Sequence, residues 1–256
     1  MVDAMKPPGK ASPWFTQLTE SGQQHVVICL PYAGMGSAVF GGWSALHFDA
    51  ADLFAAQLPG RDGRLKEAPI DNIEELVDQL ADAVIEGPFA DRPLTLLGCS
   101  FGGLIAFELA RRLRAQGRDI EQLIVAACRP PNALGVTEPV ASLPDEEMVN
   151  KLRYWYGAIP KEIAENPAML ELVLPAIRAD MRVYETHVYR EEQPLQCPIT
   201  AIGGADDRIV KLNELNGWRK ETTGKFTCRQ FAGDHFFMKS HPAPVLRLMQ
   251  QRLRSH

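Results

Sequence analysis

The segment that decides the fold reads Pro93-Leu-Thr-Leu-Leu-Gly-Cys-Ser-Phe-Gly-Gly103 and continues into a helical pattern. Leu94 to Leu97 form an apolar run of strand length, and the segment from Leu104 to Leu113 has apolar residues at helical spacing. The junction between them predicts a sharp strand-to-helix turn, in which two glycines allow close packing and Ser100 stands at the helix N-terminus. A Gly-x-Ser-x-Gly motif in this setting is typical of a nucleophilic serine, and a plain glycine turn is the alternative interpretation.

Length, composition and charge restrict the class of protein. The chain has 256 residues, of which 46% are hydrophobic, and a net charge of -5. This size supports one large core, so we expect a single domain with an insertion. Lysine and arginine are scattered, which argues against nucleic acid, and no window is apolar enough to span a bilayer or act as a signal sequence. We expect a cytoplasmic monomer that binds neither nucleic acid nor membrane.

The five cysteines, Cys29, Cys99, Cys128, Cys197 and Cys228, are odd in number, widely spaced and mostly inside apolar runs. This pattern favours reduced, buried thiols over disulfides or metal ligands. We therefore expect no disulfide, no metal site and no cofactor.

Apolar strands alternate with amphipathic helices over most of the chain. Strands are expected at 25–30, 52–58, 94–97, 123–128, 197–202 and 226–231, with an edge strand near Trp14 to Leu18, a helix that begins at Asp71 and ends before Gly87, and a closing helix over 242–254. This alternation predicts an α/β fold with a mostly parallel sheet covered by helices on both faces. We assign residues 13–133 and 195–256 to this core and residues 1–12 to a disordered N-terminus.

Residues 134–194 interrupt the alternation. Ser142 is expected to cap a helix over 145–156 that ends at Gly157, and Asn166-Pro167 to open a second helix. Both helices carry large apolar side chains. We interpret this block as a helical lid over the site, with ordinary packing onto the sheet as the alternative.

One carboxylate and one imidazole follow later strands, at the sheet edge where Ser100 is expected. Asp207 ends the loop Gly203-Gly-Ala-Asp-Asp207, and His235 follows the next strand. A serine hydroxyl needs a base to take its proton, and that base needs a third group to orient it. The order Ser, Asp, His therefore predicts a catalytic triad of Ser100, Asp207 and His235. Asp206 fits the spacing less well, and turn residues or a helix cap are the alternative interpretations.

A loop of small residues, Pro31-Tyr-Ala-Gly-Met-Gly-Ser37, follows the first strongly apolar strand. Small side chains let backbone N–H groups approach a substrate carbonyl, so this loop is a candidate source of an oxyanion donor. A strand-ending turn is the alternative interpretation.

Five segments together resemble the type II thioesterases of nonribosomal peptide and polyketide synthesis. They are Pro31-Tyr-Ala-Gly34, Gln57-Leu-Pro-Gly-Arg61, Gly98-Cys-Ser-Phe-Gly-Gly103, Gly203-Gly-Ala-Asp-Asp207 and Gly233-Asp-His-Phe236, and the resemblance spans about residues 13 to 250. It implies the α/β-hydrolase fold, the triad named above, and an oxyanion hole formed by the N–H groups of Ala33 and Phe101. Met35 departs from a glycine that is common in the family, and Cys99 departs from a frequent histidine.

The resemblance also implies a function and its contacts. The expected enzyme is a stand-alone serine thioesterase that removes aberrant or stalled acyl groups from the phosphopantetheine arm of acyl or peptidyl carrier domains. Five residues are expected to bind the substrate or to belong to the lid: Tyr32, Met35, Met148, Tyr154 and Trp155. Arg61 and Arg64 are expected to form a docking patch for an acidic carrier, with solvated surface as the alternative.

Three other functions remain open from the sequence. The first is a medium-chain acyl carrier thioesterase of fatty acid synthesis, and the second is an esterase that acts on oxygen esters. The third is a hydrolase-fold protein that binds a ligand without turning it over. All three positions of the expected triad are present, which argues against the third.

Overall fold

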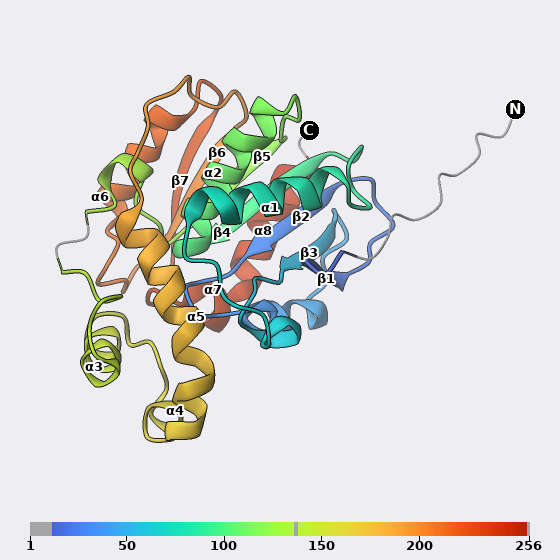
Figure 1. Cartoon of the computed structure of the whole chain (residues 1–256). Helices are drawn as coiled ribbons and strands as arrows, with labels where there is room; N and C mark the ends of the chain where they lie inside the picture. Colours follow the sequence, from blue (N-terminus) through green and yellow to red (C-terminus); the bar gives the residue numbers. More distant parts are fainter. Residues whose placement is uncertain (1–11, 136–137, 255–256) are drawn as a thin grey trace, which may run out of the picture.

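A seven-stranded sheet forms the centre of the protein in the computed structural model, which describes residues 12–135 and 138–254 (Figure 1). The strands are β1 (Phe15–Thr19), β2 (Val26–Leu30), β3 (Asp52–Ala56), β4 (Leu94–Cys99), β5 (Gln122–Ala126), β6 (Ile199–Gly204) and β7 (Phe226–Phe231), in the spatial order β1-β3-β2-β4-β5-β6-β7. Only β1 runs antiparallel to its neighbour. The predicted mostly parallel sheet and its edge strand are confirmed. The predicted disordered segment 1–12 lies outside the described residues except for Ser12.

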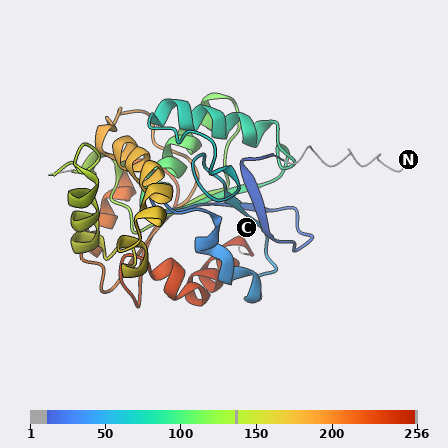
Figure 2. The ribbon, with the colours of Figure 1, turned by 60° about the horizontal axis from the view of Figure 1, so that its bottom comes forward.

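Helices cover both faces of the sheet (Figure 2). One face carries α1 (Ile73–Ile85) and α2 (Phe101–Ala115), and the other carries the 3₁₀ segment Ser37–Ala45 together with α7 (Phe237–Ser240) and α8 (Pro242–Leu253). Because both faces are covered, every residue of β2 through β6 is buried. This is why these strands read as continuous apolar runs in the sequence.

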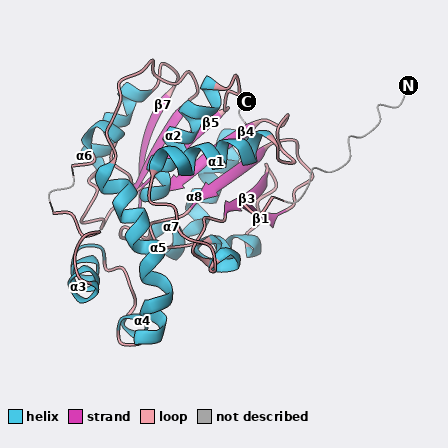
Figure 3. Ribbon diagram, in the orientation of Figure 1, coloured by secondary structure: helices cyan, strands magenta, loops and turns pink. Residues whose placement is uncertain are grey.

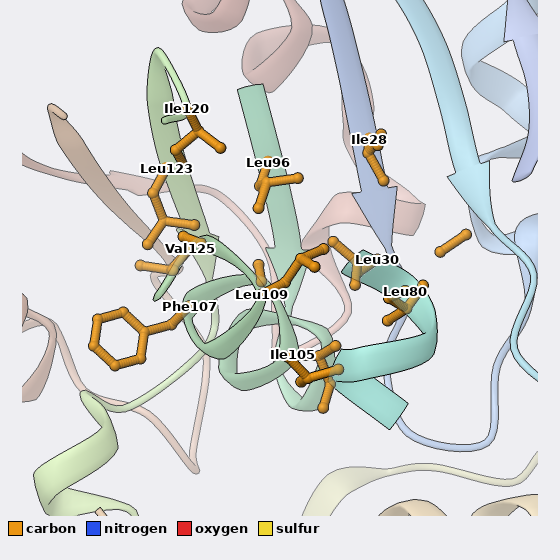
Figure 4. Close-up of a cluster of buried hydrophobic side chains, with 14 of the residues drawn as sticks. Ile28, Leu30, Leu80, Leu96, Ile105, Phe107, Leu109, Ile120, Leu123 and Val125 are labelled. Atoms are coloured by element: carbon orange, nitrogen blue, oxygen red, sulfur yellow. The ribbon is translucent and has the colours of Figure 1, made fainter. Parts of the chain in front are cut away.

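The larger part of the core lies between the sheet and the pair α1 and α2. In Figure 4, Leu30 and Leu96 point from β2 and β4 toward Leu80 of α1 and Ile105 and Leu109 of α2. These side chains are fully buried. Their packing fixes α2 against β4, and it therefore fixes the strand-to-helix turn at Ser100.

Three helices stand between β5 and β6 in the chain: α3 (Asp145–Tyr156), α4 (Lys161–Ala164) and α5 (Pro167–Thr186) (Figure 3). They enclose an apolar cluster of their own, separate from the clusters on the sheet, made of Val140, Ala141, Met148, Val149, Leu152, Ile159, Leu174, Ile177 and Met181. Short elements complete the described chain: 3₁₀ turns at Asp62–Arg64, Pro131–Ala133 and Asn216–Glu221, and helix α6 (Leu212–Leu215).

The helix ends agree with the sequence signals in part. The Asn166 side chain accepts from the Met169 N–H at 3.3 Å and so caps α5, and Gly157 ends α3 in the left-handed conformation, as predicted. The predicted cap of α3 is wrong, because Pro144 and not Ser142 precedes the helix. Likewise α1 begins at Ile73, two residues after the predicted start at Asp71, with Asn72 as its cap.

Two further expectations concern the whole chain. All five cysteines are free thiols. Over the described ranges, 12–135 and 138–254, no helix combines the length and the apolar character needed to cross a membrane.

Candidate active site

Ser100 occupies a strained turn between β4 and α2. Its backbone angles are φ +53° and ψ −114°, and its N–H donates to the carbonyl of Ala126 at 2.7 Å. A Cβ atom on Gly98 would lie 2.0 Å from the carbonyl oxygen of Gly102, and one on Gly102 would lie 2.4 Å from that of Leu30. Only glycine therefore fits on either side of the serine. Such backbone strain costs about 1–3 kcal/mol and is common where a side chain is presented for reaction.

Ser100, His235 and Asp207 form one hydrogen-bonded chain. Ser100 Oγ lies 3.0 Å from His235 Nε2, and His235 Nδ1 lies 2.9 Å from Asp207 Oδ2. Asp207 follows β6, and His235 follows β7, so both reach the sheet edge at which β4 ends. The carboxylate and the imidazole are 2% and 4% exposed, whereas Asp206 is exposed to solvent. The structure thus brings together the three predicted side chains and selects Asp207 over its neighbour.

Asp207 is held as a carboxylate. Its Oδ1 accepts from the N–H groups of Ile209 at 2.8 Å and Val210 at 3.1 Å, while Oδ2 faces His235. Burial alone would raise the pKa of Asp207, but the hydrogen bond and charge of His235 and the two amide donors outweigh burial and lower this pKa below its ordinary value of 3.8. The carboxylate therefore orients the His235 ring and can stabilise an imidazolium.

Two backbone amides near Ser100 have no acceptor among the described residues. The Phe101 N–H opens helix α2, and the Ala33 N–H lies in a turn closed by the Met35 N–H, which donates to the carbonyl of Tyr32 at 3.0 Å. Ala33 and Phe101 line the same cavity as Ser100. Their amides are therefore available to a ligand oxygen, as an oxyanion hole requires.

A cavity of about 330 Å³ opens over Ser100 and His235. Residues 138–186, most of them helical, supply most of its apolar wall, including Leu152, Trp155, Ile159, Ile163, Val173, Ile177 and Met181. Across the described part of the chain, no three His, Cys, Asp or Glu side chains are grouped so as to hold a metal ion. The serine, the imidazole and the carboxylate lie beneath this apolar chamber.

Sequence comparison identifies the family. A sequence model described as "Thioesterase domain" matches residues 25–253, which is nearly the whole chain. The chain belongs to the thioesterase family.

Individual relatives narrow the family to its type II members. The gramicidin S biosynthesis protein GrsT of Aneurinibacillus migulanus is 32% identical over 243 residues, which cover 94% of each protein. The type II thioesterase BorB from the borrelidin biosynthetic cluster is 34% identical with a TM-score of 0.82, over 95% of this chain and 97% of BorB. YbtT, a type II thioesterase from the yersiniabactin pathway, is 25% identical with a TM-score of 0.86, over 94% and 98% of the two chains. The predicted α/β-hydrolase fold and the resemblance to type II thioesterases are confirmed.

The five residues of this thioesterase that were predicted for substrate binding or for the lid divide into two groups. Tyr32, Met35 and Trp155 line the cavity. Met148 does not line it, because it is fully buried within the apolar cluster of the inserted helices. Tyr154 does not line it either, because it lies on the outer side of α3 with 85% of its surface exposed. Met148 and Tyr154 both lie in the inserted helix α3, but neither reaches the cavity wall.

The predicted docking patch at Arg61 and Arg64 is not an exposed surface. These arginines are 6% and 9% exposed, and both are engaged within the chain. Arg61 pairs with Asp180 of α5, and Arg64 pairs with Glu67 at 2.6 Å and lies over the Trp14 ring at 4.1 Å. Because neither guanidinium group faces solvent, the expectation of an exposed basic patch here is wrong.

Sequence reasoning named Tyr32 as a site residue but missed Tyr156 and Phe236, and it did not predict that all three rings surround His235. Tyr32, Tyr156 and Phe236 have ring centroids 5.7, 5.5 and 5.3 Å from that of the imidazole. Burial raises the pKa of Tyr32 and of Tyr156, so both hydroxyl groups stay neutral near the base. Tyr156 is aromatic, but so is its neighbour Trp155, and the sequence does not show which of the two rings lies against His235.

Proposed function

We propose that this thioesterase hydrolyses acyl groups carried as thioesters on the phosphopantetheine arm of carrier domains, with Ser100, His235 and Asp207 as its catalytic triad. The observation that carries the proposal is the hydrogen-bonded chain from Ser100 Oγ through His235 to Asp207 at the floor of an apolar cavity. Such a chain activates a hydroxyl that is otherwise a weak nucleophile at neutral pH.

The first half of the reaction acylates the serine. His235 Nε2 takes the Ser100 proton as Oγ attacks the thioester carbonyl carbon, and the N–H groups of Ala33 and Phe101 donate to the oxyanion. The intermediate collapses with cleavage of the C–S bond, the pantetheine sulfur leaves as a thiol with the proton held by His235, and the imidazole is neutral again. A thiol with a pKa near 8.5 is a good leaving group, so protonation by His235 matters less here than it does for an amide.

The second half releases the acid. Water gives a proton to His235 as its oxygen attacks the acyl-Ser100 carbonyl, and the same two amides hold the second oxyanion. Collapse of this intermediate returns the proton to Ser100 Oγ and frees the carboxylic acid. Asp207 keeps the imidazole oriented through both halves and stabilises its positive charge.

Residues 134–194 act in this proposal as a lid, and residues 13–133 with 195–256 act as the hydrolase core. Two observations support the division: the inserted helices have their own apolar cluster, and they supply most of the apolar cavity wall. A lid of this kind excludes bulk water around the acyl chain and opens to admit the pantetheine arm.

Editing of an assembly line is the biological role that we propose. BorB and YbtT are named as type II thioesterases of biosynthetic clusters, and GrsT is named as a gramicidin S biosynthesis protein. By this similarity, the substrate is an acyl group that blocks a carrier domain of a nonribosomal peptide or polyketide synthase. The partner is then the carrier domain itself, and hydrolysis restores its free thiol.

The test is hydrolysis of acyl groups from a purified carrier domain that has been loaded with several acyl-pantetheines. We expect the wild type to release free acid and carrier thiol, and Ser100→Ala to release neither while remaining folded. A fluorophosphonate probe should label the wild type and not the variant. Retention of hydrolysis by Ser100→Ala, or a faster rate on a matched oxygen ester than on the thioester, would overturn the proposal.

A further inference from the structure

A buried ion pair joins helix α5 to the segment that follows β3, and it lies outside the Ser100, His235 and Asp207 chain. Arg61 is 6% exposed and Asp180 is 1% exposed. Arg61 Nη2 donates to Asp180 Oδ1 at 2.9 Å, and Nη1 donates to Oδ2. Two charges withdrawn from water are costly unless good geometry and further hydrogen bonds compensate for their desolvation. The further hydrogen bonds of this pair show what it holds.

The same two side chains hold the backbone of the loop after β2. The Gly34 N–H donates to Asp180 Oδ2 at 2.7 Å, and Arg61 Nη1 also donates to the carbonyl of Met35 at 3.4 Å. Gly34 and Met35 belong to the turn that carries the Ala33 amide. The direction of that amide is therefore set by the contacts of the two residues that follow it.

Helix α5 packs directly onto this turn. Gly34 has φ +69°, and a Cβ atom at this position would lie 2.1 Å from Cγ1 of Ile177, three residues before Asp180 on the same helix. The far end of the loop is held by Asp62, whose Oδ2 accepts from the Ser37 N–H at 2.7 Å and from Ser37 Oγ at 2.9 Å. The loop is thus clamped between α5 and the Arg61-Asp62 segment.

We infer that Arg61 and Asp180 are positioning residues for the oxyanion hole, and that they couple the seating of helix α5 to the direction of the Ala33 N–H. The inference rests on the proposed function, because it takes Ala33 as an oxyanion donor. With α5 seated, Asp180 fixes the turn, and Arg61 cancels a negative charge that would otherwise oppose a nearby oxyanion. Movement of α5 away from the sheet removes the acceptor of the Gly34 N–H, and the oxyanion hole is then incomplete.

Two variants test the inference through steady-state hydrolysis of an acyl-pantetheine thioester. Asp180→Asn removes the charge at nearly constant shape. The double variant Arg61→Met/Asp180→Leu removes both charges, a change that buried ion pairs often tolerate without loss of stability, and leaves the Gly34 N–H without its acceptor. We expect kcat to fall about 10- to 100-fold in each, less than the 10²–10³-fold loss that follows removal of a whole oxyanion donor. KM should stay within about threefold, because the acyl wall is unchanged.

A second readout separates positioning from general damage. Trifluoromethyl ketones add to a serine and place an oxyanion in the hole, whereas an uncleavable thioether analogue only occupies the cavity. We expect the affinity for the ketone to weaken in parallel with kcat, while the affinity for the thioether is retained.

The matched control is Asp71→Asn. Asp71 pairs at 2.7 Å with Arg182, which lies on α5 like Asp180. Both side chains are half exposed, so loss of that pair should leave kcat unchanged. The inference is overturned if a folded Asp180 variant keeps kcat within about twofold of the wild type, if thioether and ketone affinities fall together, or if neither variant folds. Failure of the proposed function looks different, because then the wild type is inactive or Ser100→Ala is active.

Discussion

Tyr156, the last residue of helix α3, meets the His235 imidazole edge to face, with ring centroids 5.5 Å apart and planes at 65°. This contact places a residue of the inserted helices directly against the proposed base. Asp180 of α5, another inserted helix, accepts from the Gly34 N–H and so holds the loop after β2, which carries the Ala33 amide. Both halves of the proposed machinery, base and oxyanion hole, therefore touch the proposed lid, and its closed position completes them together.

Shortening Tyr156 to alanine should impair catalysis through loss of this contact. We expect Tyr156→Ala to lower kcat/KM about 5- to 50-fold, because an aromatic pair is worth about 0.5–1.5 kcal/mol beyond its buried area and the ring also lines the cavity. Tyr156→Phe keeps the ring and should stay near wild type. The measurement is the steady-state kcat/KM of the wild type and both variants on one acyl-pantetheine thioester. A larger loss in the phenylalanine variant would mean that the hydroxyl, and not the ring, is the important group.

The turn at Ser100 should not accept a side chain beside the serine. Gly98→Ala would bring a methyl group to 2.0 Å from the Gly102 carbonyl oxygen, so β4 and α2 would have to separate. We expect a loss of about 3 kcal/mol or more in the free energy of unfolding, as for overpacked cores, together with loss of activity. Urea unfolding measures this loss. Gly42→Ala is the control, because a Cβ atom there meets nothing within 4 Å, and its stability should not change noticeably.

Asp207→Asn should separate the orientation of His235 from folding. The amide cannot stabilise an imidazolium and favours the wrong tautomer, so we expect kcat to fall about 10⁴-fold. The pKa of Asp207 is lowered in the folded protein, so the stabilisation by its carboxylate is complete above the ordinary pKa of 3.8 and is lost as the pH falls through the lowered value. The wild type should therefore be more stable than the variant at pH 7, and the difference should shrink below pH 3.8. A difference that grows on acidification would contradict this assignment.

Local patterns were enough to predict the fold and the three central side chains. The glycines around Ser100 and the positions of Asp207 and His235 after apolar strands are features of short segments. Parallel strands then bring those segments to one edge. Such patterns do not predict the tertiary contacts of a helix. Helical spacing does not tell which side of α3 faces the cavity, and Trp155 does so while Tyr154 faces solvent.

Partners distant in sequence explain the other errors. Arg61 was predicted to lie on the surface because arginine side chains are usually exposed. Its partner Asp180 lies 119 residues away on helix α5, and no local sequence pattern predicts where that helix packs. The segment Ser37–Ala45 was not predicted as a 3₁₀ helix, and its buried Phe40 and Trp43 are explained only by their packing under α7 and α8. Tertiary packing decided these features.

The cavity wall should set the preferred acyl length. Val173 of α5 lines the cavity, and its neighbour Leu172 does not and is 49% exposed. Val173→Phe adds volume inside the chamber, so we expect kcat/KM for an octanoyl thioester to fall about 10-fold or more relative to acetyl, since one methylene in an apolar pocket is worth about 1–3 kcal/mol. Leu172→Phe, on the same helix, should leave the ratio unchanged. Competition between octanoyl- and acetyl-loaded carrier domains measures the ratio directly. An equal loss for both acyl groups would mean that the acyl chain does not reach Val173.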